Sequence, residues 1–297
     1  MFKFKEYCAI FGGYLGPEAC KTRRLMNIAV YIGKEELRGD DRVIALLDEL
    51  ACGGCKILDV SAEIKVPENA DMLLSIGGDG TFLNAAMMVA GKDIPVAGVN
   101  LGRMGFLSEN RPEDVAQAVL AGEYTVESRA MLEAEVQTGK PEIDACPFAL
   151  NEMTVRRSGS AMLTVDVCVN GVKLPTYWGD GLIISTSSGS TAYSLSVGGP
   201  IVMPDAKVLI VSPVAPHNLN VRPLVVPDSS SIDLAVSSRD AYFEFSADNR
   251  TVVVPENTKV RIRMAQFSLK RIRLNKSNFI QALTDKLFWG EDVRNIR

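Results

Sequence analysis

The first half of the chain alternates short apolar runs with segments of helical periodicity. The apolar runs are NIAVYIG, KILDV, MLLSI and IPVAGVN, and the helical segments are DRVIALLDELACGG, a stretch that begins at Thr81, and RPEDVAQAVLAGEY. Strands that alternate with helices in this way are typical of a parallel sheet flanked by helices. We therefore expect an α/β domain with a Rossmann-like parallel sheet over residues 26–134.

From about Glu133 onward, apolar positions recur at every second residue. The expected strands are FALNEMTVRR, LTVDVCVNGVKL, GLIISTSS, KVLIVSPV, SIDLAVSS, AYFEFSAD and KVRIRMAQFSLKRIRL, and Asn170-Gly171 supplies a hairpin turn between two of them. Repeated short strands predict an all-β sandwich over residues 135–271. The last apolar segment, NFIQALTDKLFWG, has helical periodicity. We expect this helix to return to the first domain, so that residues 272–297 belong there.

Composition narrows the class of protein. The 297 residues, 47% hydrophobic and 23% charged, describe an ordinary soluble protein with room for about two domains. A net charge of −4 argues against a general binder of nucleic acid or membrane surfaces. Six irregularly spaced cysteines predict no disulfide framework and favour a reduced, cytoplasmic setting. Residues 1–25 are expected to be a poorly ordered leader, because a second methionine, Met26, directly precedes the first strand.

Two patterns that often signal chemistry carry little weight in this chain. Cys52-Gly-Gly-Cys55 resembles half of a zinc site or a redox pair, but no second pair of ligands follows it. His217 is the single histidine, and the chain lacks a nucleophile-elbow motif, which argues against a Ser-His-Asp triad. Acid–base chemistry is therefore expected to fall to carboxylates, and we assign no residue as a metal ligand.

The most informative segment is the turn Gly77-Gly78-Asp79-Gly80, which ends the apolar run MLLSI. Three glycines in four positions allow positive φ and close approach of a ligand to the backbone. We expect Thr81 to cap the following helix, whose free amides and dipole attract anions such as phosphates. Asp79 is the charged side chain of this turn, so phosphate chemistry around a carboxylate is predicted. The turn has neither the Gly-Lys-Ser/Thr of a P-loop nor the spacing of a dinucleotide-binding loop.

A second cluster of chemistry lies in the β-rich half. Residues 179–200 read GDGLIISTSSGSTAYSLSVGGP, with many hydroxyl groups and five glycines. Asp180 precedes an apolar strand, where its carboxylate could accept hydrogen bonds from a ribose or an amide. Tyr193 has apolar neighbours and could stack on a base. Asn151-Glu152 combines an amide with a carboxylate, a pair that could bind a purine edge or a sugar.

Together these motifs make the chain resemble the bacterial NAD kinases from about Met26 to the final KLFWGEDVRN. The matching landmarks are Gly77 to Thr81, NLGRMGFL, Asn151-Glu152, residues 179–200 and PHNLNVRPLVVPDSS. The resemblance implies phosphorylation of the adenosine ribose 2′-hydroxyl of NAD to give NADP. It implies ATP, or polyphosphate in some members, as donor, together with Mg²⁺ or another divalent ion. It also implies a homodimer or homotetramer in which the sandwich domains contribute to each other's substrate pockets.

The resemblance also assigns site residues by matching position. Asp79 resembles the family's catalytic carboxylate. The positions that resemble the dinucleotide-binding residues are Asp79 itself, Gly80, Asn151, Glu152, Asp180 at the far end of NAD, and the pocket wall Thr191, Ala192, Tyr193, Ser194, Leu195 and Ser196.

Some positions depart from the family pattern. Ser187 and Ser188 replace the usual Pro-Thr, and Asn84 stands where some members have arginine. Arg103 is therefore our hypothesis for the cation that neutralises the phosphates. The segment Asp248 to Arg250 matches the family only in part, so we assign it no role in the site.

Two other functions remain open at this stage. A Gly-Gly-Asp-Gly turn also occurs in lipid kinases of the diacylglycerol or sphingosine type and in phosphofructokinases; Asn151-Glu152 together with residues 189–196 argues against both. A dinucleotide-binding sensor without catalysis is the alternative from a different class. The intact Asp79 argues against it, because binding an anion does not require an acid.

Overall fold

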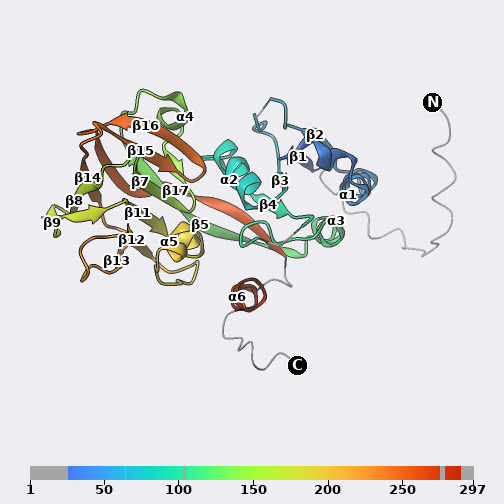
Figure 1. The fold of residues 1–297 in the computed structure, drawn as a ribbon. Coiled ribbons are helices and arrows are strands. Elements are labelled where there is room, and N and C mark those ends of the chain that lie inside the picture. Colours follow the sequence, from blue (N-terminus) through green and yellow to red (C-terminus); the bar gives the residue numbers. More distant parts are fainter. Residues whose placement is uncertain (1–25, 64, 103–104, 275–277, 289–297) are drawn as a thin grey trace, which may run out of the picture.

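The computed structural model describes residues 26–63, 65–102, 105–274 and 278–288. An α/β lobe and a β-sandwich lobe are joined by two long strands (Figure 1). The fold class expected from the sequence is confirmed. The expected leader, residues 1–25, and Arg103 lie outside the described residues.

The α/β lobe is built on four parallel strands in the order β4-β3-β1-β2. Its strands are β1 (Asn27–Ile32), β2 (Lys56–Asp59), β3 (Met72–Ile76) and β4 (Val96–Val99), and its helices are η1 (Glu35–Gly39), α1 (Asp41–Cys52), α2 (Asp79–Met88) and α3 (Pro112–Ala121). Side chains from α1 and α3 pack with Ile28 and Val30 on one face of β1. Side chains from α2 pack with Ala29 on the opposite face. The two faces of the sheet are therefore covered by different helices.

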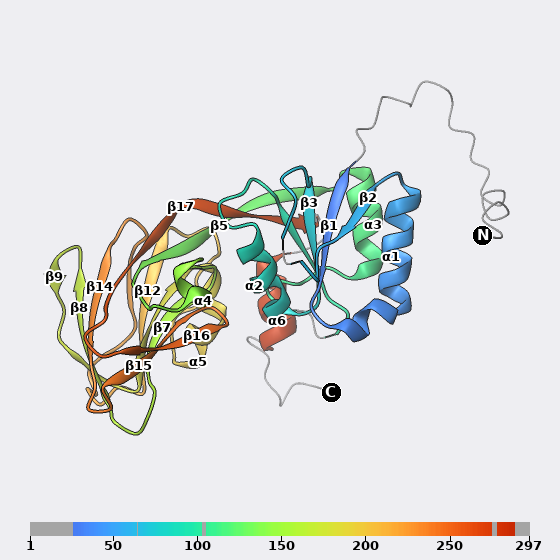
Figure 2. The same ribbon diagram turned by 90° about the horizontal axis from the view of Figure 1, so that it is seen from above.

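Two long antiparallel strands connect the lobes (Figure 2). These are β5 (Tyr124–Glu135) and β17 (Lys259–Leu274), and their register shifts between Met264 and Ser268. At one end, Arg271 of β17 lies beside Val96 of the parallel sheet. At the other end, β17 pairs with β14 of the sandwich. One sheet of eleven strands therefore runs through both lobes. The position of the domain boundary within this sheet stays a prediction.

The sandwich packs a six-stranded antiparallel sheet against the distal part of the eleven-stranded sheet. The six strands, in spatial order, are β13 (Leu224–Pro227), β12 (Val208–Val214), β11 (Gly181–Thr186), β7 (Glu152–Arg157), β15 (Tyr242–Ala247) and β16 (Arg250–Pro255). The facing strands are β10 (Tyr177–Gly179), β8 (Leu163–Val169), β9 (Val172–Lys173), β14 (Ile232–Ser237) and β6 (Phe148–Ala149), with parts of β5 and β17. One hydrophobic cluster fills the space between them.

Short helices complete the fold: α4 (Pro141–Asp144), η2 (Ser188–Thr191), α5 (Tyr193–Ser196) and the terminal α6 (Phe279–Leu287). The return of α6 to the first lobe is confirmed, since Phe279 contacts Phe106 with ring centroids 6.2 Å apart. In Figure 1, α6 lies on the opposite side of β5 and β17 from α2. Within the described part of the chain, no helix has the length and apolar character needed to cross a membrane.

Three local expectations need correction or refinement. The prediction that Thr81 caps the helix is wrong: α2 begins at Asp79 with Gly78 as its N-cap. The expected strand FALNEMTVRR is split into β6 and β7, because the backbone leaves the ladder at Leu150 and Asn151. Strands β5, β10, β13 and β16 were not expected from the sequence. The Asn170-Gly171 hairpin is confirmed, with φ of 51° and 79°.

Candidate active site

The turn after β3 closes around the side chain of Thr81. A Cβ on Gly77 would lie 2.4 Å from Thr81 Oγ1, and one on Gly33 would lie 2.2 Å away, so both positions need glycine for packing. Gly77 also has a φ of +150°, which favours glycine. Gly78 and Gly80 are different, because a Cβ on either would meet nothing within 4 Å. Their exposed surface is therefore open to a ligand beside Asp79.

The Asp79 carboxylate is held by three successive backbone amides of one loop. Its Oδ1 accepts from Leu107 N at 3.1 Å and Ser108 N at 2.8 Å, and its Oδ2 accepts from Phe106 N at 2.9 Å. A Cβ on Gly105 would lie 1.8 Å from Oδ1, so glycine is needed for this approach. A carboxylate offers about four acceptor positions. One of them, on Oδ2, therefore remains for a ligand.

A second aspartate, Asp248, holds the Asn151-Glu152 pair in the same manner. Its Oδ1 accepts from Asn151 N at 2.8 Å and Glu152 N at 3.2 Å, and its Oδ2 accepts from Leu150 N at 2.7 Å. Asp248 lies in the turn between β15 and β16 with a φ of +52°. The amides satisfied by this carboxylate are those that the break between β6 and β7 removes from the ladder. Asp248 therefore fixes the backbone at the pair predicted to bind NAD.

Glu152 and Asp248 form a coupled acidic pair. Burial, reinforced by the negative charge of Asp248, raises the pKa of Glu152 to about 8, while the Tyr193 amide acts in the opposite direction. Burial also raises the pKa of Asp248, against the effect of its three amides and of Arg250. Glu152 Oε2 is buried and has no hydrogen-bond partner in the structure. The three amides thus favour the ionised form of Asp248, whereas burial favours the neutral form of Glu152.

The segment that contains η2 and α5 packs directly on Asn151. A Cβ on Gly189 would come within 2.1 Å of Asn151 O, so glycine is required there. Thr186 Oγ1 donates to Leu150 O at 2.7 Å and accepts from Gly189 N at 3.0 Å. These contacts bring the predicted wall, residues 191–196, next to Asn151 and Glu152. The Thr186 hydroxyl thus holds the backbone of this segment against Leu150.

Not every hydroxyl in that segment faces a ligand site. Ser194 is fully buried, and its Oγ lies 3.0 Å from Ser212 Oγ. Ser190 Oγ donates to Val202 O at 3.2 Å and accepts from Val202 N at 3.1 Å. Thr191, by contrast, lines a cavity.

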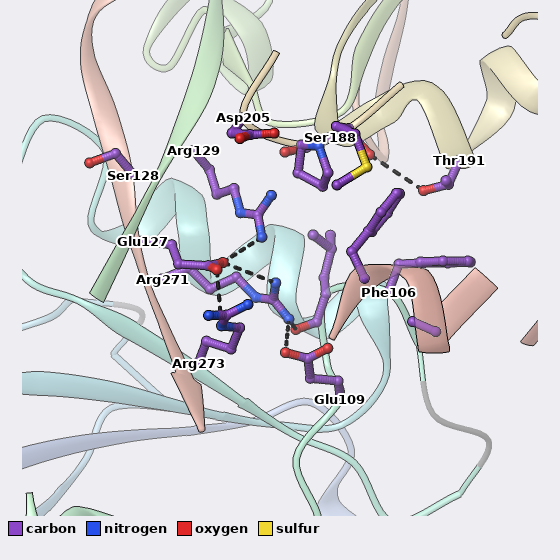
Figure 3. A pocket seen from close by; sticks show the side chains of 15 residues that line it. Phe106, Glu109, Glu127, Ser128, Arg129, Ser188, Thr191, Asp205, Arg271 and Arg273 are labelled. Atoms are coloured by element: carbon purple, nitrogen blue, oxygen red, sulfur yellow. Dashed lines mark hydrogen bonds and ion pairs between the residues drawn. The ribbon is translucent and has the colours of Figure 1, made fainter. Parts of the chain in front are cut away.

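That cavity, of about 310 Å³, separates the loop that holds Asp79 from the η2 segment. Phe106 and Leu107 line it from the first side, Ser188 and Thr191 from the second, and α6 closes a third side (Figure 3). Beneath them, Glu127 lies among Arg129, Arg271 and Arg273, at nitrogen–oxygen distances of 2.5, 3.8 and 3.0 Å. The site therefore combines an aromatic and hydroxyl-bearing wall with a charged base supplied by β5 and β17.

Asp180 lies at the opposite end of strand β7 from Glu152. Its carbonyl accepts from Arg157 N, and its carboxylate pairs with Arg157 Nε at 3.0 Å. Arg157 ends strand β7, whereas Glu152 begins it. Five residues of strand separate Asp180 from Glu152 by about 17 Å.

Two family models of known proteins match the chain. One family model, described as the ATP-NAD kinase N-terminal domain, matches residues 42–124. A second, described as the ATP-NAD kinase C-terminal domain, matches residues 150–274. The two models together span more than half of the chain.

The chain belongs to the NAD kinase family.

Individual relatives of the family are similar over most of their length. A curated NAD kinase of Flavobacterium psychrophilum is 42% identical over 239 residues, covering 79% of this chain and 81% of the relative. A curated NAD kinase of Bacteroides fragilis is 43% identical over 244 residues, covering 80% and 83%.

Two solved structures of kinases share the fold. An NAD kinase from Archaeoglobus fulgidus in complex with ATP is 26% identical, with a TM-score of 0.70, and the match covers 84% of this chain and 95% of that one. Yeast NADH kinase complexed with NADH has a TM-score of 0.79 at 21% identity, covering 92% and 90%, and shows similarity of fold alone.

Within this NAD kinase fold, Asp248 and the amides of residues 106–108 were missed by sequence reasoning. Asp248 lies about 97 residues from the backbone that it holds, and backbone amides leave no mark in a sequence. The neighbouring Asn249 donates from Nδ2 to Asn84 Oδ1 of α2 at 2.8 Å. Asn84 thus links α2, which begins at Asp79, to the turn that holds Asn151-Glu152. Asn84 is the position at which some family members have arginine.

Proposed function

We propose that this protein transfers the γ-phosphate of ATP to the adenosine ribose 2′-hydroxyl of NAD, forming NADP and ADP. The observation that carries the proposal is the geometry of Asp79: three amides fix its carboxylate, and one acceptor position stays open beside the exposed Gly78 and Gly80. Asn151 and Glu152, against which the segment of residues 186–196 packs, would bind the nucleoside that carries the acceptor hydroxyl.

In the proposed mechanism, Asp79 orients the acceptor and then takes its proton. The 2′-hydroxyl donates to the open position on Asp79 Oδ2, in line with the γ-phosphorus. As the new phosphorus–oxygen bond forms and the bond to ADP breaks, the proton passes to Asp79. Phosphoryl transfer has a loose transition state, so alignment matters more than a strong base. A carboxylate in this role contributes about 10²- to 10⁴-fold in rate.

Glu152 is proposed to bind a ribose hydroxyl of NAD through its unpaired oxygen. Oε2 is buried without a donor, and a hydroxyl from the substrate would supply one. The carboxylate accepts such a bond better when it is ionised. Because its pKa is raised to about 8 in the empty site, binding of NAD should release a proton near neutral pH.

A divalent ion is proposed to accompany the phosphates. Among the described residues, no group of three or more histidine, cysteine or acidic side chains could hold a metal ion. Mg²⁺ commonly binds through phosphate oxygens, waters and one or two carboxylates. An ion that arrives with ATP would therefore receive most of its ligands from the phosphates and from water. The ion would neutralise charge on the transferring phosphoryl group.

Asp180 is proposed to act in the pocket of a second copy of the chain, within a homodimer or homotetramer. The proposal rests on the family resemblance, which implies that the sandwich domains contribute to each other's pockets. Mixing two inactive variants, Asp180→Ala and Glu152→Ala, tests it by complementation. A heterodimer would contain one intact pocket, so a 1:1 mixture after subunit exchange should recover about a quarter of wild-type activity. No recovery would mean that both residues serve one pocket in the same chain.

A cytoplasmic location is also part of the proposal. It is supported by the thiols Cys52, Cys146 and Cys168, which a reducing compartment maintains.

Formation of NADP by the purified protein tests the central proposal. NAD with ATP and Mg²⁺ should give NADP, and NADH, diacylglycerol and sphingosine serve as competing acceptors, with polyphosphate as an alternative donor. Phosphorylation of a lipid without NADP formation would identify a lipid kinase. Tight binding of NAD without any turnover would identify a sensor.

A further inference from the structure

The terminal helix α6 holds the loop that positions Asp79. Lys286 Nζ donates to Gly105 O and lies 4.8 Å from the centroid of the Phe106 ring. On the preceding turns of α6, Leu283 is buried, and the Phe279 ring lies 6.2 Å from that of Phe106. One helix thus fixes both residues that immediately precede Leu107 and Ser108.

The loop is held by hydrogen bonds that come from several elements. Residues 105–108 belong to neither helix nor strand, so their backbone position depends on individual contacts. Leu107 O accepts from Arg271 Nη2 at 3.2 Å, and Ser108 Oγ donates to Gly77 O at 2.7 Å. Ser108 O also accepts from Gly105 N at 3.1 Å and from Asn100 Nδ2 at 3.2 Å. These contacts secure the second half of the loop and tie Gly105 to it. Lys286 adds a bond from α6 to the first half, next to the amide that binds Asp79 Oδ2.

The charges around Lys286 come from several elements. Burial lowers the pKa of Lys286, while Glu109, Asp79 and Asp285 favour its charged form and Arg271 opposes it. The ammonium therefore lies within electrostatic range of the Asp79 carboxylate, although it bonds the loop and not the carboxylate.

We propose that Lys286 is a positioning residue for phosphoryl transfer, which acts by holding Gly105 and Phe106 and thereby the carboxylate of Asp79. The proposal rests on the role proposed above for Asp79. A displacement of about 1 Å in a reacting group can cost about 10²-fold in rate, so a contact that lies outside the substrate pocket can still control kcat.

Three variants of the full-length protein test the effect on turnover. Lys286→Met keeps the apolar stem and removes the charged donor, Lys286→Arg keeps a charged donor that can stack on Phe106, and Gln281→Met is the matched control on an exposed position of the same helix. We expect Lys286→Met to lower kcat about tenfold with KM for NAD changed less than about twofold. Lys286→Arg should restore most of kcat, and Gln281→Met should match wild type. An unchanged kcat in Lys286→Met would overturn the proposal.

Amide hydrogen exchange provides a readout that needs no catalysis. Lys286→Met should speed exchange at residues 106–108 and leave residues 150–152 unchanged. In the Asp79→Asn background, where the carboxylate is already lost, adding Lys286→Met should lower kcat by less than threefold, because the two residues act through one contact. Unchanged exchange at residues 106–108, or a full tenfold loss in that background, would overturn the proposal. If Asp79→Asn alone kept full activity, the proposed mechanism would fail, whereas the exchange result would stand.

Discussion

Asp79 and Asp248 have the same hydrogen-bond pattern in two different turns. Each accepts two amides on Oδ1 and one on Oδ2, from three consecutive residues of a distant segment. Their surroundings differ. Asp79 begins a helix between two exposed glycines, whereas Asp248 lies in a hairpin turn against Glu152 and Arg250.

The difference shows how one local device serves two purposes. In the hairpin, Asp248 gives an acceptor to three backbone amides that would otherwise be unpaired, so this aspartate is a structural support. In the glycine turn, three amides fix the carboxylate of Asp79, whose remaining acceptor position faces open surface. A residue's hydrogen bonds alone therefore do not identify a reactive carboxylate; the space beside it does.

The largest effect is expected for Asp79→Asn. The side-chain amide would keep the shape, but its NH₂ group could neither accept from Phe106 N nor take the proton of the acceptor. We expect kcat to fall by about 10²- to 10⁴-fold, with KM for NAD nearly unchanged. Steady-state assays with purified protein measure both constants. Near-normal kcat would remove Asp79 from the chemical role assigned to it.

A loss of about 2–4 kcal/mol in unfolding free energy is expected for Asp248→Ala, because three amides would lose their acceptor. KM for NAD should rise about tenfold, since Asn151 and Glu152 would lose their support. Arg239→Ala, at an exposed position between β14 and β15, is the control and should cost less than about 1 kcal/mol. Denaturant unfolding and NAD kinetics measure these changes. If Asp248→Ala affected kcat alone, the two aspartates would not differ as described.

The smallest effect is the pH dependence of stability, tested with Glu152→Gln. The pKa of Glu152 is raised from 4.5 to about 8 in the folded protein. Ionisation is thus easier in the unfolded chain, so this group lowers stability as pH rises from about 4.5 to 8. Glutamine cannot ionise, so the variant should match wild type near pH 4 and become more stable than wild type as the pH rises from about 5 to 8. Melting temperatures measured across that range would contradict the assignment if the two curves stayed parallel.

Much of the fold could be predicted because its signals are local. The period of apolar residues identified β1 to β4 and most sandwich strands, and Asn170-Gly171 identified a hairpin by its turn chemistry. The pairing of β5 with β17 joins residues that are more than 100 positions apart, and no local pattern specifies such a partner. The helix cap failed for a local reason: the glycines allow α2 to begin two residues before Thr81.

The site was predictable only as far as side chains define it. Asp79, Asn151 and Glu152 stand out as polar residues beside glycines or apolar strands. Their supports are backbone amides and distant side chains such as Asp248 and Lys286, whose positions depend on the folded chain. The segment Asp248 to Arg250 matches the family only in part, so the sequence gave no reason to connect it with Asn151.

The close approach of Gly105 to Asp79 sets a limit on evolution at this position. Even the methyl group of alanine would overlap the carboxylate oxygen, since it would lie 1.8 Å away. A library that encodes all amino acids at position 105, selected for NADP supply in living cells, should return glycine codons alone. The smallest side chain is thus the one under the strictest selection, although it takes no part in any chemical step.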